Sequence, residues 1–206
     1  MNNKKIDTIV FDLGNVLVDF CWRKLFTKMG LEGDEFERLA RATVHNVDWD
    51  LNDQGVFEDD ELVAVFTEND PSMEDRIIEL VDRLEECIEP FDYSDKWIDD
   101  LMKAGYKVYI LSNFSHKAYY DCGAKLDFVR KTDGAILSFE DKLIKPDSAI
   151  YSLLFSRYNI NPENAVFIDD REVNIEAAVK MGMNGIVFKN RPQVVEELRQ
   201  LGVLTD

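Results

Sequence analysis

Apolar runs rich in β-branched residues alternate with amphipathic stretches, and this alternation constrains the fold more than any other feature of the chain. Amphipathic patterns with helical spacing occupy 94–105, 146–159 and 171–182, and another follows from 194 to 206. Because a strand, helix, strand order favours parallel strands joined by right-handed crossovers, we predict a doubly wound α/β sheet. The predicted strands are short and mostly buried: IDTIVF (6–11), KVYILS (107–112), GAIL (134–137), AVFID (165–169) and GIVF (185–188).

One long segment interrupts this alternation. From about Cys21 to Pro90 the patterns are helical, with no convincing strand, and turn signals such as Asp70-Pro71 separate them. We therefore predict an α/β core formed by residues 1–19 and 91–206, and a small helical cap domain formed by residues 20–90. A cap inserted after the first strand would lie over the carboxyl end of that strand, where it is placed to act as a lid.

Composition limits the partners and the compartment. The chain has 41 acidic and 24 basic residues and a formal charge of -17, which would repel nucleic acid and anionic membranes. No apolar run reaches the roughly 18 residues of a membrane span, and the first apolar stretch is too short for a signal peptide. The cysteines (Cys21, Cys87 and Cys122) are widely spaced and suit packing in a reducing compartment. We expect a cytoplasmic protein, and these residues do not indicate its oligomeric state.

Polar residues stand where several predicted strands end or in the loops that follow. Each has a structural reading: small polar or acidic residues cap helices, and a lysine before proline suits an exposed loop. Parallel strands would nevertheless bring all of them to one edge of the sheet, where ligands bind in such folds. Their joint occurrence favours a functional site over separate structural roles. The residues are Asp12, Ser112, Asn113, Lys145, Asp169 and Asp170.

The chemistry of this set is coherent. Clustered carboxylates repel one another unless a cation lies between them, and oxygen ligands without His or Cys favour Mg²⁺. Asp12, Asp170 and the backbone carbonyl of Gly14 are the predicted metal ligands. The metal, Lys145 and the Ser112-Asn113 loop would supply positive charge for a phosphoryl group. Asp12 is then the natural nucleophile, and its attack would form an aspartyl phosphate.

Four motifs occur in order along the chain: FDLGNVLVD, ILSN, the lysine of IKPD, and FIDD. Over about residues 7–190 the chain thereby resembles the haloacid dehalogenase-like (HAD) hydrolase superfamily. The resemblance implies a Rossmann-like core with a helical cap, in which Asp12 is nucleophile and metal ligand. It further implies that Ser112 and Lys145 bind phosphate, that Asp170 is the main fourth-motif metal ligand with Asp169 supporting, and that Asn174 replaces an acid that steadies the water shell of the metal.

The sequence departs from the pattern of the phosphatases in this family at Gly14. An aspartate usually occupies this position, where it protonates the leaving oxygen and then activates water. Glycine offers a carbonyl to a metal but no proton, and general acid–base catalysis is worth roughly 10²- to 10⁴-fold. The loss of this acid should slow the reaction most for substrates with poor leaving groups. A substitute donor from the cap, His45 or Asp48, is one alternative.

Three functions remain open. The first is a Mg²⁺-dependent phosphomonoesterase acting on a small phosphorylated metabolite such as a hexose 1-phosphate, because the FDLGNVxVD form resembles a subgroup with sugar-phosphate phosphatases. The second is a metal-independent 2-haloacid dehalogenase, which the acidic Asp169-Asp170 pair disfavours because it would repel a carboxylate substrate. The third is a non-catalytic phospholigand-binding protein, which Gly14 favours and the retained nucleophile disfavours.

Substrate choice is expected to depend on the inner face of the cap. Aromatic rings with a few hydrogen-bonding groups suit sugars or other compact polar metabolites. For Trp22 a place in the core of the cap itself is the better interpretation, and Phe114 either closes the pocket or packs in the core. The residues placed nearest the substrate are Phe20, Trp22, His45, Trp49 and Asn52.

Overall fold

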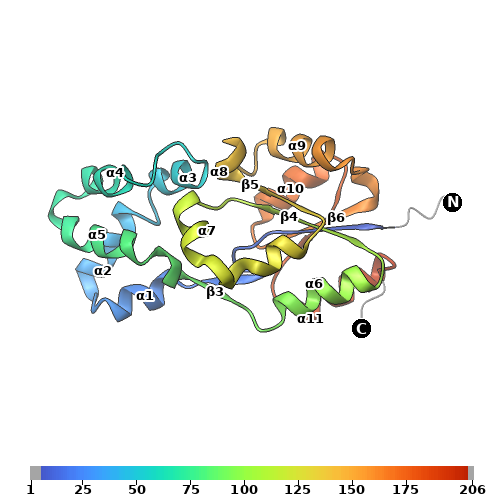
Figure 1. Ribbon diagram of the computed structural model, residues 1–206, viewed down its shortest axis with the longest axis horizontal. Helices are drawn as coiled ribbons and strands as arrows, with labels where there is room; N and C mark the ends of the chain where they lie inside the picture. Colours follow the sequence, from blue (N-terminus) through green and yellow to red (C-terminus); the bar gives the residue numbers. More distant parts are fainter. Residues whose placement is uncertain (1–5, 204–206) are drawn as a thin grey trace.

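A five-stranded parallel sheet forms the centre of the molecule, as the computed structural model of residues 6–203 shows (Figure 1). β1 pairs with β4 on one side and with β6 on the other, so Phe11 lies opposite Ile110 and Ile168. The doubly wound α/β prediction is confirmed, with small shifts at strand ends. The strand order is β5 (Gly134–Leu137), β4 (Lys107–Ser112), β1 (Thr8–Phe11), β6 (Ala165–Asp169) and β7 (Asn184–Val187).

Helices cover both faces of this sheet (Figure 1). α6 (Ser94–Lys103) and α11 (Arg191–Gln200) pack on the face that carries Ile9 and Phe11, whereas α9 (Ser148–Tyr158) and α10 (Glu172–Lys180) pack on the face of Val10. Successive strand side chains point to opposite faces, so a continuously apolar strand such as β1 can fill both layers of the core. The last residues of the predicted C-terminal helix, 204–206, lie outside the described residues.

Shorter helices occupy the connections. α7 (His116–Cys122) follows β4 and leads into a 3₁₀ segment, Gly123–Lys131, whereas α8 (Ser138–Asp141) follows β5 directly. A further 3₁₀ turn, Pro162–Asn164, precedes β6. Because these strands are parallel, the loops after β1, β4, β5 and β6 all lie at the same edge of the sheet.

A helical segment lies beyond the carboxyl ends of the strands (Figure 1). It is bracketed by a pair of antiparallel strands, β2 (Val18–Phe20) and β3 (Ile88–Pro90). The expectation of no convincing strand from about Cys21 to Pro90 was wrong for β3, because three-residue strands are too short to show a repeating pattern. The division into core and cap domains stays a prediction. Between the two strands lie α1 (Trp22–Lys28), α2 (Gly33–Ala42), α3 (Val47–Asp53), α4 (Leu62–Asn69), α5 (Glu74–Asp82) and 3₁₀ turns at Pro71–Met73 and Leu84–Cys87.

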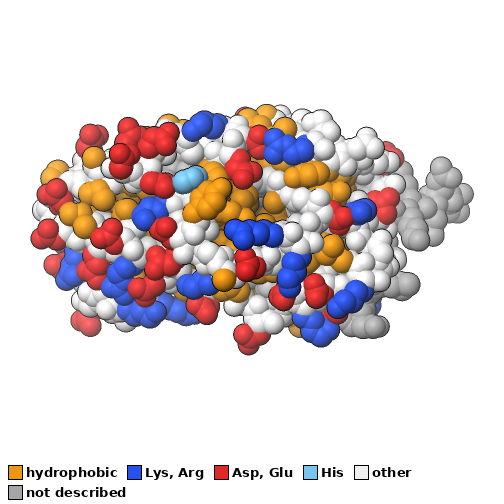
Figure 2. Space-filling model, in the orientation of Figure 1, with side chains coloured by type: hydrophobic (Ala, Val, Ile, Leu, Met, Phe, Trp, Pro, Cys, Tyr) orange, Lys and Arg blue, Asp and Glu red, His pale blue; other side chains and the backbone are white. Residues whose placement is uncertain are grey.

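The surface carries the acidic excess of the chain. Acidic side chains are prominent over α4 and α5 at the end of the molecule far from both termini (Figure 2). All three cysteines are free and buried, as expected for packing residues. Within residues 6–203, no helix is both long enough and apolar enough to cross a membrane.

Candidate active site

Asp12 lies immediately after β1 and is 6% exposed. Its Oδ1 accepts hydrogen bonds from the Leu13 amide and the Ser112 hydroxyl, both at 2.7 Å, and forms an ion pair with Lys145 Nζ at 2.8 Å. Within the described chain, no donor contacts the other oxygen, Oδ2. The carboxylate is therefore held in one orientation through Oδ1, with Oδ2 left to react or to bind a cation.

Lys145 is the buried cation of the site. Its Nζ also contacts Oδ2 of Asp169 at 2.7 Å, and the side chains of Lys145 and Asp169 are 1% and 0% exposed. Burial raises the pKa of Asp12, an effect that neighbouring Lys145 opposes. The pKa of Lys145 is also raised: burial acts to lower it, but Asp12 and Asp169 together outweigh burial. The lysine thus offsets the repulsion between two carboxylates and remains charged.

Asn113 positions Lys145 through the backbone. Its side-chain oxygen accepts from the Lys145 amide at 2.8 Å, and its Nδ2 donates to the Lys145 carbonyl at 3.1 Å. This two-point contact ties the loop after β4 to the loop that carries the lysine. Both Asn113 and Lys145 line the pocket described below.

Three carboxylates could hold a cation at this edge of the sheet. One oxygen each of Asp12, Asp169 and Asp170 lie within 4.8 Å of one another. Asp169 is already engaged by Lys145, the Arg171 amide and Asn174 Nδ2. Asp170 is engaged only through Oδ2, by Asn15 at 2.8 Å, among the described residues. Asp12 and Asp170 therefore have the free ligand oxygens, whereas Asp169 orients its neighbours.

The donor set fits a hydrated hard cation. All three acidic residues offer oxygen, and this is the ligand type that Mg²⁺ prefers. Asn174 lines the same pocket, and its buried Oδ1 has no hydrogen-bond partner in the described structure. A buried acceptor without a donor is costly, and a metal-bound water would satisfy it. By the resemblance, Asn174 stands where the family often has an acid that steadies the water shell of the metal.

Added Mg²⁺ is expected to raise the midpoint of thermal unfolding, because it would bind a carboxylate cluster that the folded chain brings together. A ligand at 100 times its dissociation constant stabilises by about 2.7 kcal/mol. The measurement is thermal unfolding across a Mg²⁺ titration, for wild type, Asp170→Asn and Asp127→Asn, the last an exposed acid paired with Arg130. Asp170→Asn should weaken the Mg²⁺ effect and Asp127→Asn should not; equal responses from all three proteins would argue against this site.

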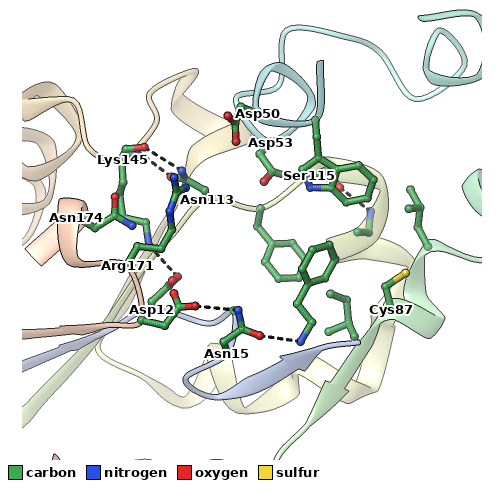
Figure 3. A pocket seen from close by; sticks show the side chains of 18 residues that line it. Asp12, Asn15, Asp50, Asp53, Cys87, Asn113, Ser115, Lys145, Arg171 and Asn174 are labelled. Atoms are coloured by element: carbon green, nitrogen blue, oxygen red, sulfur yellow. Dashed lines mark hydrogen bonds and ion pairs between the residues drawn. The ribbon is translucent and has the colours of Figure 1, made fainter. Parts of the chain in front are cut away.

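A cavity of about 200 Å³ opens from these groups (Figure 3). The polar end contains Asp12, Gly14, Lys145 and Asp170. The opposite wall is largely apolar and combines helical-segment residues with the α7 region. Burial raises the pKa of the Cys87 thiol to about 12, so it stays protonated near neutral pH. The apolar wall comprises Phe20, Trp49, Leu84, Cys87, Ile88, Phe114 and Ala118.

Several predicted substrate contacts lie elsewhere. His45 is exposed and packs edge-on against Trp22, which itself belongs to the aromatic core of the helical segment. Asp48 accepts a hydrogen bond from Asn69 at 2.8 Å. Asn52 is buried. None of the four residues lines the cavity: Trp22, His45, Asp48 and Asn52. Phe20, Trp49 and Phe114 do line it.

Sequence reasoning missed several lining residues. Asn15 adopts a left-handed backbone conformation (φ 56°), which asparagine tolerates, and this turns its amide toward Asp170. Arg171 follows the fourth motif directly, and that adjacency was a usable signal. Asp53, Leu84 and Ile88 come from the helical segment and carry no local signal of a site.

Comparison with known proteins identifies relatives for most of the chain. The family model of the haloacid dehalogenase-like hydrolases matches residues 6–182. A sesquiterpene phosphatase of Aspergillus oryzae is 22% identical over 93% of this chain and 94% of that protein. (S)-2-haloacid dehalogenase 4A of Burkholderia cepacia is 31% identical over 43% of this chain and 38% of that enzyme. Flavin mononucleotide hydrolase 1 of Arabidopsis thaliana is 34% identical over 29% of this chain, which spans only 24% of that protein.

Solved structures share the fold. A HAD family enzyme from Bacteroides thetaiotaomicron superposes with a TM-score of 0.73 at 21% identity, covering 95% of this chain and 99% of that one. A complex of that enzyme with magnesium and inorganic phosphate gives a TM-score of 0.70 at 22% identity, covering 89% and 94%. At such identities the likeness establishes the architecture.

Proposed function

Because the chain belongs to the haloacid dehalogenase-like hydrolase family, as its motifs indicated, we propose that it is a magnesium-dependent phosphomonoesterase. The proposed reaction passes through an aspartyl phosphate on Asp12. Support comes from phosphatases among the relatives and from the magnesium and phosphate complex of a protein with the same fold. The substrate is a small phosphorylated molecule.

The arrangement around Asp12 carries this proposal. Three donors engage Oδ1, so the carboxylate cannot rotate freely and Oδ2 is available to attack phosphorus. Holding a nucleophile in an attacking orientation removes much of the entropic cost of a bimolecular step. Burial further strips water from the carboxylate, which strengthens every local electrostatic interaction.

Two successive displacements would complete the reaction. In the first, an Asp12 oxygen bonds to phosphorus while the bond from phosphorus to the leaving alcohol breaks. In the second, water attacks the phosphorus of the aspartyl phosphate, which releases inorganic phosphate and restores Asp12. Lys145 and the Ser112 hydroxyl bind the phosphoryl oxygens and hold the attacking carboxylate.

Asp12, Asp170 and the Gly14 carbonyl would hold Mg²⁺, with Asp169 in support through Lys145. When bound, the cation supplies the positive charge that lets a phosphate approach this acidic edge. Arg171 adds a further positive side chain at the pocket. Asn15 keeps Asp170 in place through its side-chain amide.

The apolar wall indicates the class of leaving alcohol. Sugar hydroxyls pressed against Phe114, Leu84 and Ile88 would lose their hydrogen bonds to water, at a cost of about 1–3 kcal/mol for each unsatisfied group. A compact aliphatic or aromatic alcohol would instead bury apolar surface there. The small cavity favours a short group. We therefore favour an apolar phosphomonoester, while the hexose 1-phosphate remains a prediction of the sequence motif.

Phosphate release from a matched panel tests this function. The panel contains phenyl and short alkyl phosphates and hexose 1- and 6-phosphates, each assayed with Mg²⁺ or with EDTA. We expect metal-dependent turnover with the highest kcat/KM for the apolar esters. Preference for a hexose phosphate would contradict the apolar assignment alone. Tight phosphate binding without turnover of any ester would instead favour a non-catalytic binding protein.

A dehalogenase is the second candidate, because glycine replaces the usual acid and part of the chain matches a 2-haloacid dehalogenase. In that reaction Asp12 would attack carbon and expel halide without a metal. The Asp169 and Asp170 carboxylates beside the nucleophile oppose a carboxylate substrate. Halide release from a 2-haloacid in EDTA would support the dehalogenase; its absence, together with Mg²⁺-dependent phosphate release, would support the phosphatase.

A further inference from the structure

Position 14 offers no side chain to donate a proton, because it is glycine, yet the backbone there can accept a side chain. A Cβ placed on Gly14 would meet no heavy atom within 4 Å beyond its chain neighbours. The two donors suggested by sequence, His45 and Asp48, do not line the cavity. An acid that protonates a poor leaving group would therefore come from another residue that lines the cavity.

Asp53 lies at the end of α3 and lines the cavity together with Asp12 and Lys145 (Figure 3). In the described chain, no donor forms a hydrogen bond with its carboxyl group. The group is therefore not committed to a structural partner. It faces the same space as the nucleophile, although about 40 residues separate the two in sequence.

The core holds this end of α3 against the pocket. The Ser138 hydroxyl donates to the Asp53 carbonyl and accepts from the Phe114 amide at 2.9 Å. Gln54 Nε2 donates to the Lys142 carbonyl at 2.9 Å, and Lys142 Nζ donates to the Gly55 carbonyl.

Gly55, just after α3, allows the chain to lie close to the backbone of Phe139 in α8. Its φ is +72°, and a Cβ there would lie 2.7 Å from the carbonyl oxygen of Phe139. A glycine is therefore required by both the backbone conformation and the available space. The position of Asp53 is therefore fixed by contacts with the region after β5, as well as by its own helix.

The surroundings of Asp53 favour its protonated form. Burial raises its pKa to about 8, and the nearby carboxylates of Asp50 and Asp12 act in the same direction. Lys145 and Arg171 oppose this effect without overcoming it. A carboxyl group with this pKa carries a proton near neutral pH and can give it up, as a general acid must.

On the premise of the proposed phosphatase function, we infer that Asp53 is the general acid and base that replaces the side chain absent at Gly14. As the bond from phosphorus to the alcohol oxygen breaks, its electron pair goes to that oxygen, which takes the proton of Asp53. The Asp53 carboxylate then accepts a proton from water as the water oxygen bonds to phosphorus. The bond from phosphorus to Asp12 breaks, and Asp53 is protonated again.

Leaving-group dependence tests this role. For Asp53→Asn, kcat/KM on an alkyl phosphate should fall by roughly 10²- to 10⁴-fold, because its alkoxide needs a proton. On p-nitrophenyl phosphate, whose leaving group is stable as an anion, kcat/KM should change only a few-fold. Slow hydrolysis of the aspartyl phosphate should then appear as a burst of p-nitrophenol. Asp48→Asn, on the same helix but outside the cavity, is the matched control and should match wild type on both esters.

A second variant separates catalysis from folding. Adding Gly14→Asp to Asp53→Asn should restore part of the alkyl phosphate activity, since the site has room for that carboxyl group. An equal loss on both esters, with no burst and no rescue, would show that Asp53 is structural and would overturn the inference. If wild type releases phosphate from neither ester, the phosphatase itself is wrong, and the inference falls with it.

Discussion

Asp12→Asn should lower Mg²⁺-dependent phosphate release by on the order of 10⁴-fold or more, because no phosphoenzyme can form without the carboxylate. Asparagine has nearly the same shape as aspartate, and its oxygen can still accept from the Leu13 amide and the Ser112 hydroxyl. The fold should therefore survive. Steady-state phosphate release measures the loss, and acid-quenched mass spectrometry should find phosphate on the Asp12 peptide of wild type only.

Asp7→Asn is the matched control for the nucleophile. Asp7 is exposed and directly precedes β1, at the end of the strand opposite to Asp12. The substitution therefore makes the same charge change beside the same strand but away from the site. It should retain wild-type turnover. Full activity in Asp12→Asn, with an unchanged unfolding midpoint, would refute covalent catalysis at this residue.

Lys145→Met should produce the largest loss of stability among the site variants. Methionine fills a similar volume but leaves Asp12 and Asp169 buried without the cation that contacts both. Breaking a buried ion pair in this way costs about 3–5 kcal/mol. Urea unfolding of the metal-free protein measures the change, against Lys180→Met, whose exposed pair with Glu176 should contribute little.

The Lys145→Met loss should also depend on pH. Without the lysine, the pKa of the buried Asp12 carboxyl group in the folded state rises further above the unfolded value. The folded state then binds more protons than the unfolded state, so stability increases as pH falls. We expect a smaller deficit relative to wild type at about pH 5.5 than at about pH 8. A deficit that is constant across this range would mean that lost packing, rather than carboxylate repulsion, causes it.

Local patterns were sufficient to locate the polar edge. Runs such as KVYILS and AVFID identify buried strands, and parallel strands place the residues at their carboxyl ends together. These patterns therefore predict that Asp12, Ser112 and Lys145 lie together, and Ser112 and Lys145 both contact Asp12. The short strands β2 and β3 were missed because their stability comes from mutual pairing.

The resemblance ranked Asp170 above Asp169 as a metal ligand, but the contacts of the two adjacent aspartates required the tertiary structure. Asp169 ends β6 and turns into the core to reach Lys145 and Asn174, whereas Asp170 meets Asn15 at the pocket. Successive residues along a strand point in opposite directions. Which of the two faces the core and which faces the pocket depends on the elements packed around them. Sequence motifs named both acids without assigning these different contacts.

The sequence alone determined the fold class, the family and the polar edge of the site, because hydrophobic period and motif order are local properties of the chain. Only the tertiary structure decided what faces that edge. Asp53 reaches the cavity through contacts of Ser138 and Lys142 with the end of α3, more than 80 residues away in sequence. Such contacts depend on how α3 packs against the loop after β5, and no local pattern in either segment encodes that packing.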